Sequence, residues 1–136
     1  MDVPVDRSAA ELRRGIESLP RTDRGLPRSD LLWLGVGEDG HTLSLFPGHD
    51  DALTASDVAI AVHDSPKPPP ERITLTLTAL AGVGNAVIFA TGAAKKEALA
   101  RALDERQLPI ALAAERIVDV GGNVAWLFDP EAASRG

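Results

Sequence analysis

The sequence predicts an α/β domain in which helices flank a mostly parallel sheet. Two short apolar runs, residues 30–36 and 85–91, lack the polar alternation of a half-exposed strand. Such runs are typical of parallel sheets, whose strands are covered on both faces. A glycine follows each run, and helical patterns occupy parts of the intervening chain. This order of elements favours an α/β layer over an all-helical or all-β domain.

The N-terminal part predicts a helix followed by a buried strand. Residues 8–19 repeat apolar side chains at three- and four-residue steps, and Pro20 ends the pattern. Ser8 and Glu11 have the spacing of a capping box, so we expect Ser8 to be the N-cap. The strand at 30–36 places Trp33 in the predicted core.

The remaining elements follow from the same patterns. Residues 73–77 alternate with period two, which predicts a strand with one apolar face and one threonine face. We expect further strands at 58–62, 85–91 and 123–128, short helices or turns at 42–46 and 78–84, a helix at 94–103, and a short tail or helix from residue 129. Residues 107–115 remain unassigned, and Trp126 is expected in the core. Residues 1–136 are interpreted as a single domain.

Composition excludes several classes of protein. The net charge of −6, from 14 basic and 20 acidic residues, disfavours a nucleic-acid-binding protein. No apolar run approaches the ~18 residues of a membrane span, and the first residues lack the pattern of a signal peptide. The chain has no cysteine and only three histidines, so neither disulfides nor a zinc site is expected. We therefore expect a cytoplasmic protein without a metal.

A glycine-rich turn after the first strand carries the candidate chemistry. Gly37 and Gly40 allow a tight backbone with accessible N–H groups, and the turn ends at Thr42. Asp39 and His41 place a carboxylate beside an imidazole, the side chain best suited to proton transfer near neutral pH. In an open α/β sheet, turns that follow the strands form the ligand site. A merely solvated loop is the alternative interpretation.

Three cations could hold an anionic ligand near this turn. Lys67 lies within a proline-rich stretch, residues 64–72, and Arg72 ends it. A stiff backbone can pre-position charge, although a rigid linker or an SH3-type ligand would share this composition. Lys95 falls in the first turn of the predicted 94–103 helix, where a bound phosphate would offset an unfavourable dipole. A solvated surface lysine is the alternative there. We expect His49 to be solvated and His63 to be structural.

Two motifs resemble the signature of the 6-phosphogluconolactonase family. The first is residues 35–48 (GVGEDGHTLSLFPG) and the second is residues 64–74 (DSPKPPPERIT). The resemblance runs from about Asp30 to Asp129 and implies a Rossmann-like sheet. Members of the family are considerably longer, with an N-terminal half that carries another phosphate loop and an arginine. The chain is therefore interpreted as the C-terminal portion of such a domain, and a homo-oligomer or a separate N-terminal half is a possible partner.

The resemblance implies hydrolysis of 6-phospho-D-glucono-1,5-lactone to 6-phosphogluconate in the pentose phosphate pathway, with no cofactor. His41 would be the general base and Asp39 would hold the loop or the imidazole tautomer. Backbone N–H groups between Gly37 and Thr42 would receive the oxyanion. Arg72 and Lys95 would bind phosphate, with Lys67 a weaker candidate. The alternatives are a glucosamine-6-phosphate isomerase/deaminase and a truncated, non-catalytic sugar-phosphate-binding domain.

Overall fold

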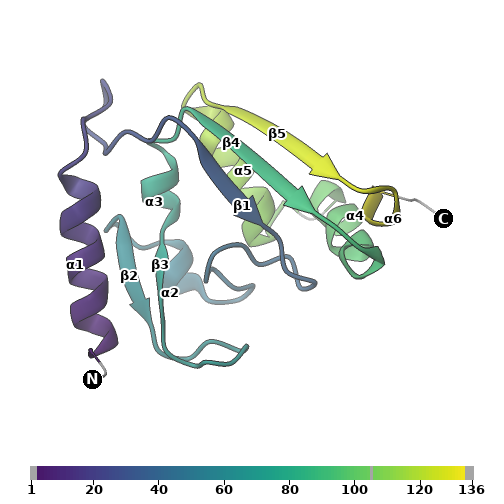
Figure 1. Ribbon diagram of the computed structural model, residues 1–136, viewed down its shortest axis with the longest axis horizontal. Coiled ribbons are helices and arrows are strands. Elements are labelled where there is room, and N and C mark those ends of the chain that lie inside the picture. The colour runs from purple at the N-terminus through teal and green to yellow at the C-terminus, as the bar shows by residue number, and fades with distance from the viewer. Residues whose placement is uncertain (1–2, 105, 134–136) are drawn as a thin grey trace.

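A three-stranded parallel sheet forms the centre of the chain (Figure 1). The computed structural model describes residues 3–104 and 106–133. The sheet contains β1 (Leu32–Gly35), β4 (Asn85–Ala90) and β5 (Asn123–Phe128), in the order β1-β4-β5. β2 (Ala59–Val62) and β3 (Arg72–Leu75) form a separate antiparallel hairpin. The predicted α/β class is confirmed, but the segments 58–62 and 73–77 do not join the parallel sheet.

The helices divide between the sheet and the hairpin. α5 contacts β5 and α3, and α1 packs against the hairpin (Figure 1). In chain order the helices are α1 (Val5–Glu17), α2 (Asp50–Leu53), α3 (Leu77–Leu80), the 3₁₀ turn η1 (Ala93–Lys95), α4 (Lys96–Asp104), α5 (Pro109–Asp119) and α6 (Pro130–Ala133). No helix within the described ranges has the length and apolar character needed to cross a membrane.

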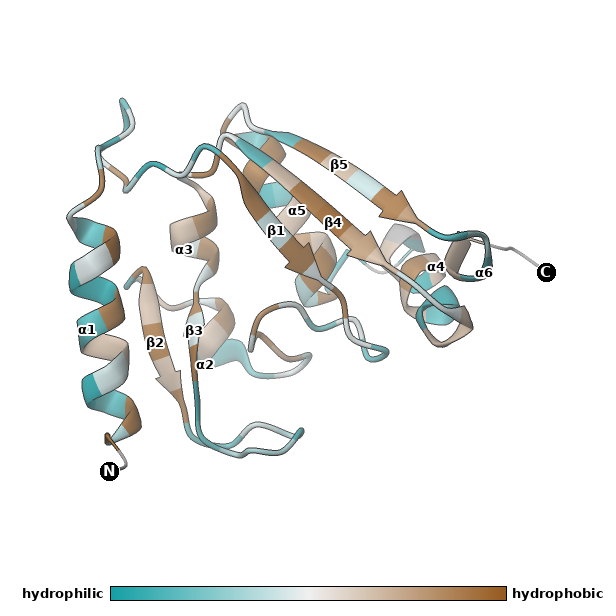
Figure 2. Ribbon diagram, in the orientation of Figure 1, coloured by the Kyte–Doolittle hydropathy of each residue, from teal (hydrophilic) through white to brown (hydrophobic). Residues whose placement is uncertain are grey.

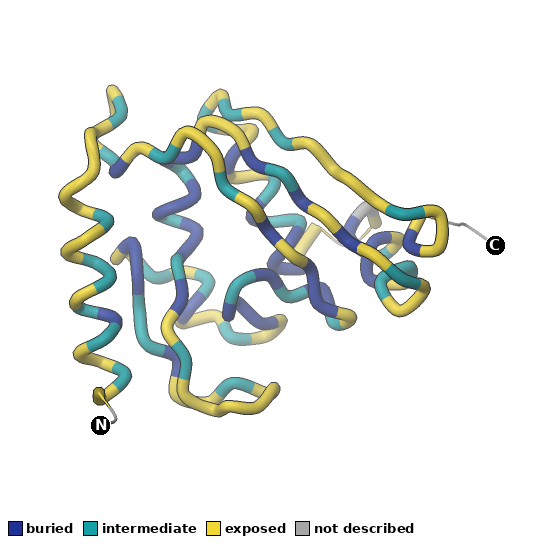
Figure 3. The backbone as a smooth tube through the Cα atoms, viewed as in Figure 1, coloured by how far each residue is buried: buried dark blue, intermediate teal, exposed yellow. Residues whose placement is uncertain are grey.

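The sheet buries one face only, which corrects the expectation that strand 30–36 is covered on both sides. Leu34 and Ile88 are paired in register and fully buried, and they belong to the same apolar core as residues of α3 and α5. On the opposite face Trp33 is 62% exposed, so its predicted core position is wrong. Trp126, also predicted in the core, is 36% exposed because it lies on an edge strand. Figure 3 shows this exposure along much of β5.

Several element boundaries differ from the prediction for local reasons. α1 begins at Val5, with Pro4 as N-cap, and the Ser8 N–H donates to the Pro4 carbonyl (3.1 Å), so Ser8 lies inside the helix. Residues 42–46 form no helix, because Leu43 adopts a positive φ of 55° and Thr42 bridges to Leu45. The unassigned segment 107–115 overlaps α5, which has a proline in its first turn, a position where a missing N–H costs little.

The threonine side of β3 faces inward, contrary to the simplest reading of its alternation. Thr74 and Thr76 are 3% and 0% exposed, whereas Ile73 is 40% exposed. Their hydroxyls are satisfied by the backbone: Thr74 Oγ1 accepts from the Ser44 N–H (3.1 Å), and Thr76 Oγ1 donates to the Asp57 carbonyl. These bonds remove the usual cost of burying a hydroxyl.

Candidate functional site

The glycine turn after β1 is closed by its own backbone and by α5. The Gly37 N–H donates to the His41 carbonyl (2.8 Å), and the Gly40 N–H donates to the Gly37 carbonyl (3.0 Å). Gly40 has φ 86°, a left-handed conformation that glycine adopts without strain. The Gly40 carbonyl accepts from the Ile110 N–H (3.0 Å) at the start of α5. The turn is therefore anchored to a core helix at the carboxyl end of the parallel sheet.

Asp39 and His41 form a hydrogen-bonded pair within this turn. Asp39 Oδ1 accepts from the His41 backbone N–H (3.1 Å) and lies in very short contact with His41 Nδ1. Burial raises the pKa of Asp39, but hydrogen bonds from the His41 side chain and backbone, with the imidazolium charge, outweigh it and lower this pKa. Because the ionised carboxylate can only accept, Nδ1 carries the proton. Nε2 makes no hydrogen bond to any residue in the described ranges.

The His41 imidazole is positioned by packing on two sides. A Cβ added at Gly37 would overlap the imidazole Cε1 and Nδ1 and would come within 2.8 Å of Asp39 Oδ1. The Phe46 ring, itself fully buried, lies 4.7 Å from the imidazole between centroids. The side chains of His41 and Asp39 are 20% and 31% exposed, so solvent still reaches the pair. This is an oriented imidazole at the edge of the sheet.

Phe46 connects His41 to Arg72, a link that no local sequence signal indicated. The Arg72 guanidinium lies over the Phe46 ring, 5.6 Å from its centroid. Its Nε donates to the Pro69 carbonyl (3.0 Å), and its Nη2 donates to the carbonyls of Lys67 (3.0 Å) and Pro68 (2.7 Å). Arg72 thus holds the proline-rich loop that connects β2 to β3. Its Nη1 has no hydrogen-bond partner within the described part of the chain.

Lys67 and Lys95 lie in different places relative to the turn. Lys67 is exposed on the proline-rich loop, which extends away from the body of the chain (Figure 1). Lys95 is half-buried in η1, directly after β4. Since β1 and β4 are parallel neighbours, the turns that follow them emerge at the same sheet edge. The structure therefore brings the His41 and Lys95 turns to one edge, although no contact joins the two side chains.

Asp129 occupies part of the turn that was expected to bind an anion. Gly92 has φ 89°, and its N–H donates to Asp129 Oδ2 (2.8 Å). The other carboxylate oxygen, Oδ1, accepts from the Ala132 N–H (2.8 Å) at the start of α6. The Gly92 N–H in this turn therefore makes a structural hydrogen bond and is not available to an anion, and Lys95 follows in η1. Gly92 and Asp129 are 37 residues apart, so no local sequence pattern indicated this hydrogen bond.

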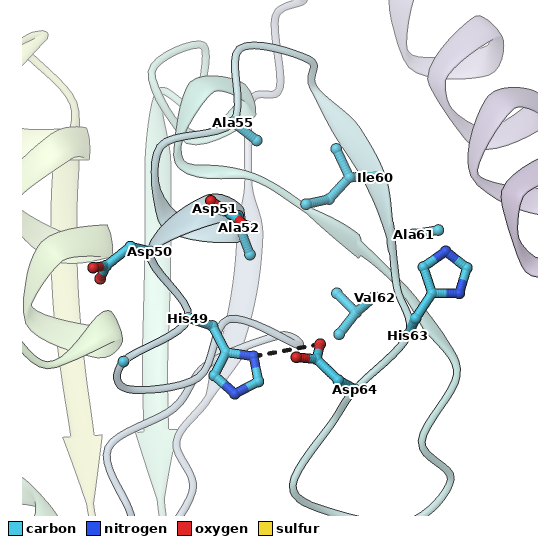
Figure 4. Close-up of a pocket in the computed structure, with 11 residues that line it drawn as sticks. His49, Asp50, Asp51, Ala52, Ala55, Ile60, Ala61, Val62, His63 and Asp64 are labelled. Carbon is cyan, nitrogen blue, oxygen red and sulfur yellow. Dashed lines mark ion pairs between the residues drawn. The ribbon is translucent and has the colours of Figure 1, made fainter.

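A hollow of about 660 Å³ lies between α2 and β2 (Figure 4). His49 Nδ1 and Asp64 Oδ1 are 3.8 Å apart in it, and the His49 side chain is only 25% exposed, so the expected solvated His49 is partly buried and paired. His63 points away, toward α1, where Nε2 is 3.1 Å from Asp6 Oδ1. Among the described residues, no three His, Asp or Glu side chains gather as metal ligands.

Comparison with known proteins gives consistent matches. The family model described as "Glucosamine-6-phosphate isomerases/6-phosphogluconolactonase" matches residues 1–126. "Probable 6-phosphogluconolactonase 1" of Arabidopsis thaliana is 42% identical over 98% of this chain and 53% of its own length. The solved 6-phosphogluconolactonase of Trypanosoma brucei is 30% identical, with a TM-score of 0.72 over 93% of this chain and 52% of that one. The solved devB protein is 28% identical, with a TM-score of 0.81 over 97% and 55%. This chain spans about half the length of the curated relatives it matches.

Proposed function

Because this chain belongs to the glucosamine-6-phosphate isomerase/6-phosphogluconolactonase family, we propose that it takes part in hydrolysing 6-phospho-D-glucono-1,5-lactone to 6-phosphogluconate. The observation that carries the proposal is the His41 imidazole, whose Nδ1 is tied to Asp39 while Nε2 remains available. That arrangement suits a general base for a water molecule. The relatives named as lactonases support this reaction over deamination. A cytoplasmic location and independence of metal are further parts of the proposal.

In the proposed reaction His41 Nε2 accepts a proton from water as the water oxygen attacks C1 of the lactone. The carbonyl C=O electrons move to oxygen and form a tetrahedral oxyanion. When the carbonyl reforms, the bond from C1 to the ring oxygen breaks, and the imidazolium returns its proton to that oxygen. Asp39 keeps the proton on Nδ1 and stabilises the transient imidazolium. Its lowered pKa means that it is a carboxylate at neutral pH.

The turn's own hydrogen bonds reduce the number of N–H groups that are free to donate to the oxyanion. The N–H groups of Gly37, Gly40 and His41 already donate to acceptors within the turn, so the two glycines shape it rather than offer donors. Thr42 is 1% exposed, and its hydroxyl donates to the Gly35 carbonyl (2.8 Å). This leaves the N–H groups of Glu38 and Asp39, which follow Gly37 and donate to no acceptor among the described residues. We assign the oxyanion contact to these two groups.

The phosphate would lie against Lys95 and Arg72. Lys95 shares the sheet edge with the His41 turn, and Arg72 reaches the His41 environment through Phe46. Arg72 retains Nη1 for a phosphate oxygen while its other nitrogens hold the proline-rich loop. Lys67 is the weaker candidate because of its position on the extended loop. The half of the relatives' length that this chain does not span would contribute further contacts.

The experiment is a lactonase assay of His41→Ala, beside His49→Ala as a matched control. Loss of a general base predicts a kcat ~10²–10⁴-fold lower with KM largely unchanged. His49 lies beyond Phe46, with its ring 5.8 Å from the phenyl ring, and its replacement should leave kcat within about twofold. Equal kcat for wild type and His41→Ala would refute the mechanism. Ammonia release from glucosamine-6-phosphate would instead indicate the deaminase reaction, and phosphosugar binding without turnover would indicate a binding domain.

A further inference from the structure

The segment that follows the glycine turn runs antiparallel to β3, and two contacts define its register. The Ser44 N–H donates to Thr74 Oγ1 (3.1 Å), and the Arg72 guanidinium lies over the Phe46 ring, 5.6 Å from its centroid. A step of two residues forward on the segment therefore corresponds to a step of two residues back on β3. Among the described residues, no backbone hydrogen bond joins the two segments. The hydrogen bond to the Thr74 hydroxyl is thus the polar contact that holds this register.

The Thr74 hydroxyl is buried, and both of its hydrogen-bonding roles are in use. Thr74 and Ser44 are 3% and 8% exposed. Thr74 Oγ1 donates to the Leu75 carbonyl (2.8 Å), so an oxygen lone pair is left to accept from the Ser44 N–H. A valine at this position would have nearly the same shape but no acceptor, and the buried N–H would lose its partner at a cost in free energy. We expect the Ser44 segment to shift away from β3 in response.

The loop that carries Lys67 has no apolar anchor of its own. No side chain between residues 63 and 71 is buried, and Figure 2 shows hydrophilic colouring along this loop, in contrast with the apolar strands β1 and β4. The loop is held by Arg72, which donates to three of its carbonyls. Thr74 lies two residues further along the same strand, so it shares a side of β3 with Arg72. The place of the whole loop therefore depends on how β3 meets the segment at 44–46.

We propose that Thr74 is a positioning residue for phosphate recognition. Its hydroxyl holds the register that keeps Arg72 over Phe46, and Phe46 lies 4.7 Å from the His41 imidazole between ring centroids. The same hydrogen bond thereby sets the separation between the guanidinium that would bind the phosphate and the imidazole that would act at the lactone carbon. The consequence for substrate binding rests on the proposed function, whereas the effect on the position of Arg72 does not.

The first test follows the position of Arg72 by NMR. Its Nε–H donates to the Pro69 carbonyl (3.0 Å) beside the Phe46 ring, so the ring current of the phenyl group shifts the proton signal. The signal is assigned by its absence in Arg72→Lys. We expect Thr74→Val, which removes the hydroxyl, to move the signal. Thr74→Ser keeps the hydroxyl and should leave the signal at its wild-type position.

The second test separates KM from kcat in the lactonase assay. Thr74→Val should raise KM for the phosphorylated lactone by about tenfold, the size expected for one weakened hydrogen bond to a charged group. Its kcat should stay within about twofold of wild type, because the contact between His41 and Asp39 is untouched. KM for gluconolactone, which has no phosphate, should not change. Thr74→Ser should have wild-type constants for both lactones.

Thr76→Val is the matched control, because it removes a buried hydroxyl just beyond the same strand. Thr76 is fully buried, and its hydroxyl donates to the Asp57 carbonyl and accepts from the Ala79 N–H (3.3 Å) at the start of α3. Neither bond reaches the segment at 44–46. We expect Thr76→Val to lower Tm as Thr74→Val does, while the Arg72 signal and both KM values stay unchanged. A purely structural role of Thr74 would make the two variants alike.

The outcomes decide the proposal whether or not the chain turns over substrate. An unchanged Arg72 signal in Thr74→Val would overturn it, as would a shift that Thr74→Ser reproduces or Thr76→Val shares. Thr74→Ala also lacks the hydroxyl, and the same results are expected of it if Thr74→Val does not fold.

A wild-type chain that hydrolyses neither lactone would contradict the proposed function, and binding is then measured by titration with 6-phosphogluconate. A Kd that is about tenfold higher in Thr74→Val supports the proposal. An equal Kd, or no binding by either protein, overturns it.

Discussion

Gly37→Ala is expected to displace the imidazole of His41 while leaving the fold intact. The new Cβ would overlap imidazole atoms Cε1 and Nδ1. Carbon atoms in contact stay about 3.5 Å apart, so the ring would have to move by roughly an ångström or more. Phe46 prevents the imidazole from moving in one direction, because the two ring centroids are only 4.7 Å apart. The ring is therefore expected to lose its contact with Asp39.

The size of the effect follows from how strongly catalysis depends on position. A misplacement of about 1 Å can reduce a rate by ~10²-fold, so kcat for Gly37→Ala should fall by about that factor with KM nearly unchanged. Gly37 does not adopt a left-handed φ, so alanine introduces no backbone strain there. We expect only a small change in Tm. The kinetics should be measured on preparations whose Tm and circular dichroism match the wild type.

Gly35→Ala is the matched control. It lies two residues earlier, at the end of β1, and an added Cβ would meet no atom within 4 Å. Its kcat should therefore equal that of the wild type. A second readout does not depend on turnover: the pKa of Asp39 should rise toward its ordinary value in Gly37→Ala, because the His41 hydrogen bonds are lost. Full activity in Gly37→Ala, or an unchanged Asp39 pKa, would refute the positioning of His41 described above.

Three further predictions concern neighbouring groups. Asp39→Asn should lower kcat by ~10²-fold or more by favouring the wrong imidazole tautomer. In the wild type the ionised Asp39 stabilises the fold at pH values above its unfolded pKa, and this stabilisation is lost as pH falls through its lowered folded pKa. NMR titration of Asp39 can check this direction. Arg72→Lys keeps the charge but loses the forked donation to the loop carbonyls, so KM should rise by about tenfold and the backbone amides of the 64–72 loop should exchange hydrogen faster; unchanged values for both would show that charge alone matters. The pKa of His63 is raised by its hydrogen bond to Asp6, with a smaller contribution from Glu71. The stabilisation of the fold by this pair is therefore full below about pH 6.5 and is lost as pH rises through the folded pKa. His63→Ala should remove this part of the pH dependence of Tm, and an identical profile in both proteins would contradict the prediction.

Local sequence patterns predicted the parallel strands and the turn that follows β1. The runs at 85–91 and 123–128 are apolar without alternation, and both form strands of the parallel sheet. The spacing of Gly37, Gly40 and His41 indicated a compact turn, because only a few residue types allow the required backbone geometry. These features depend on neighbours in the chain, and the sequence expresses them directly.

Other features depended on which segments meet in space. The alternation in β3 could not show that Thr74 faces inward. The inward Thr74 hydroxyl accepts a hydrogen bond from the Ser44 N–H, and Ser44 lies on a loop 30 residues earlier in the chain. Trp33 belongs to an apolar strand, yet it is exposed because the described chain supplies helices to one face only.

By itself the sequence determined the parallel strands, the glycine turn that carries Asp39 and His41, and the family, since each is encoded in short-range spacing. Only the tertiary structure decided that Phe46 joins His41 to Arg72, that Asp129 caps the Gly92 turn, and that one face of the sheet stays open. The physical reason is that periodicity reports the conformation of a segment, whereas burial and contact are properties of the segments that pack against it.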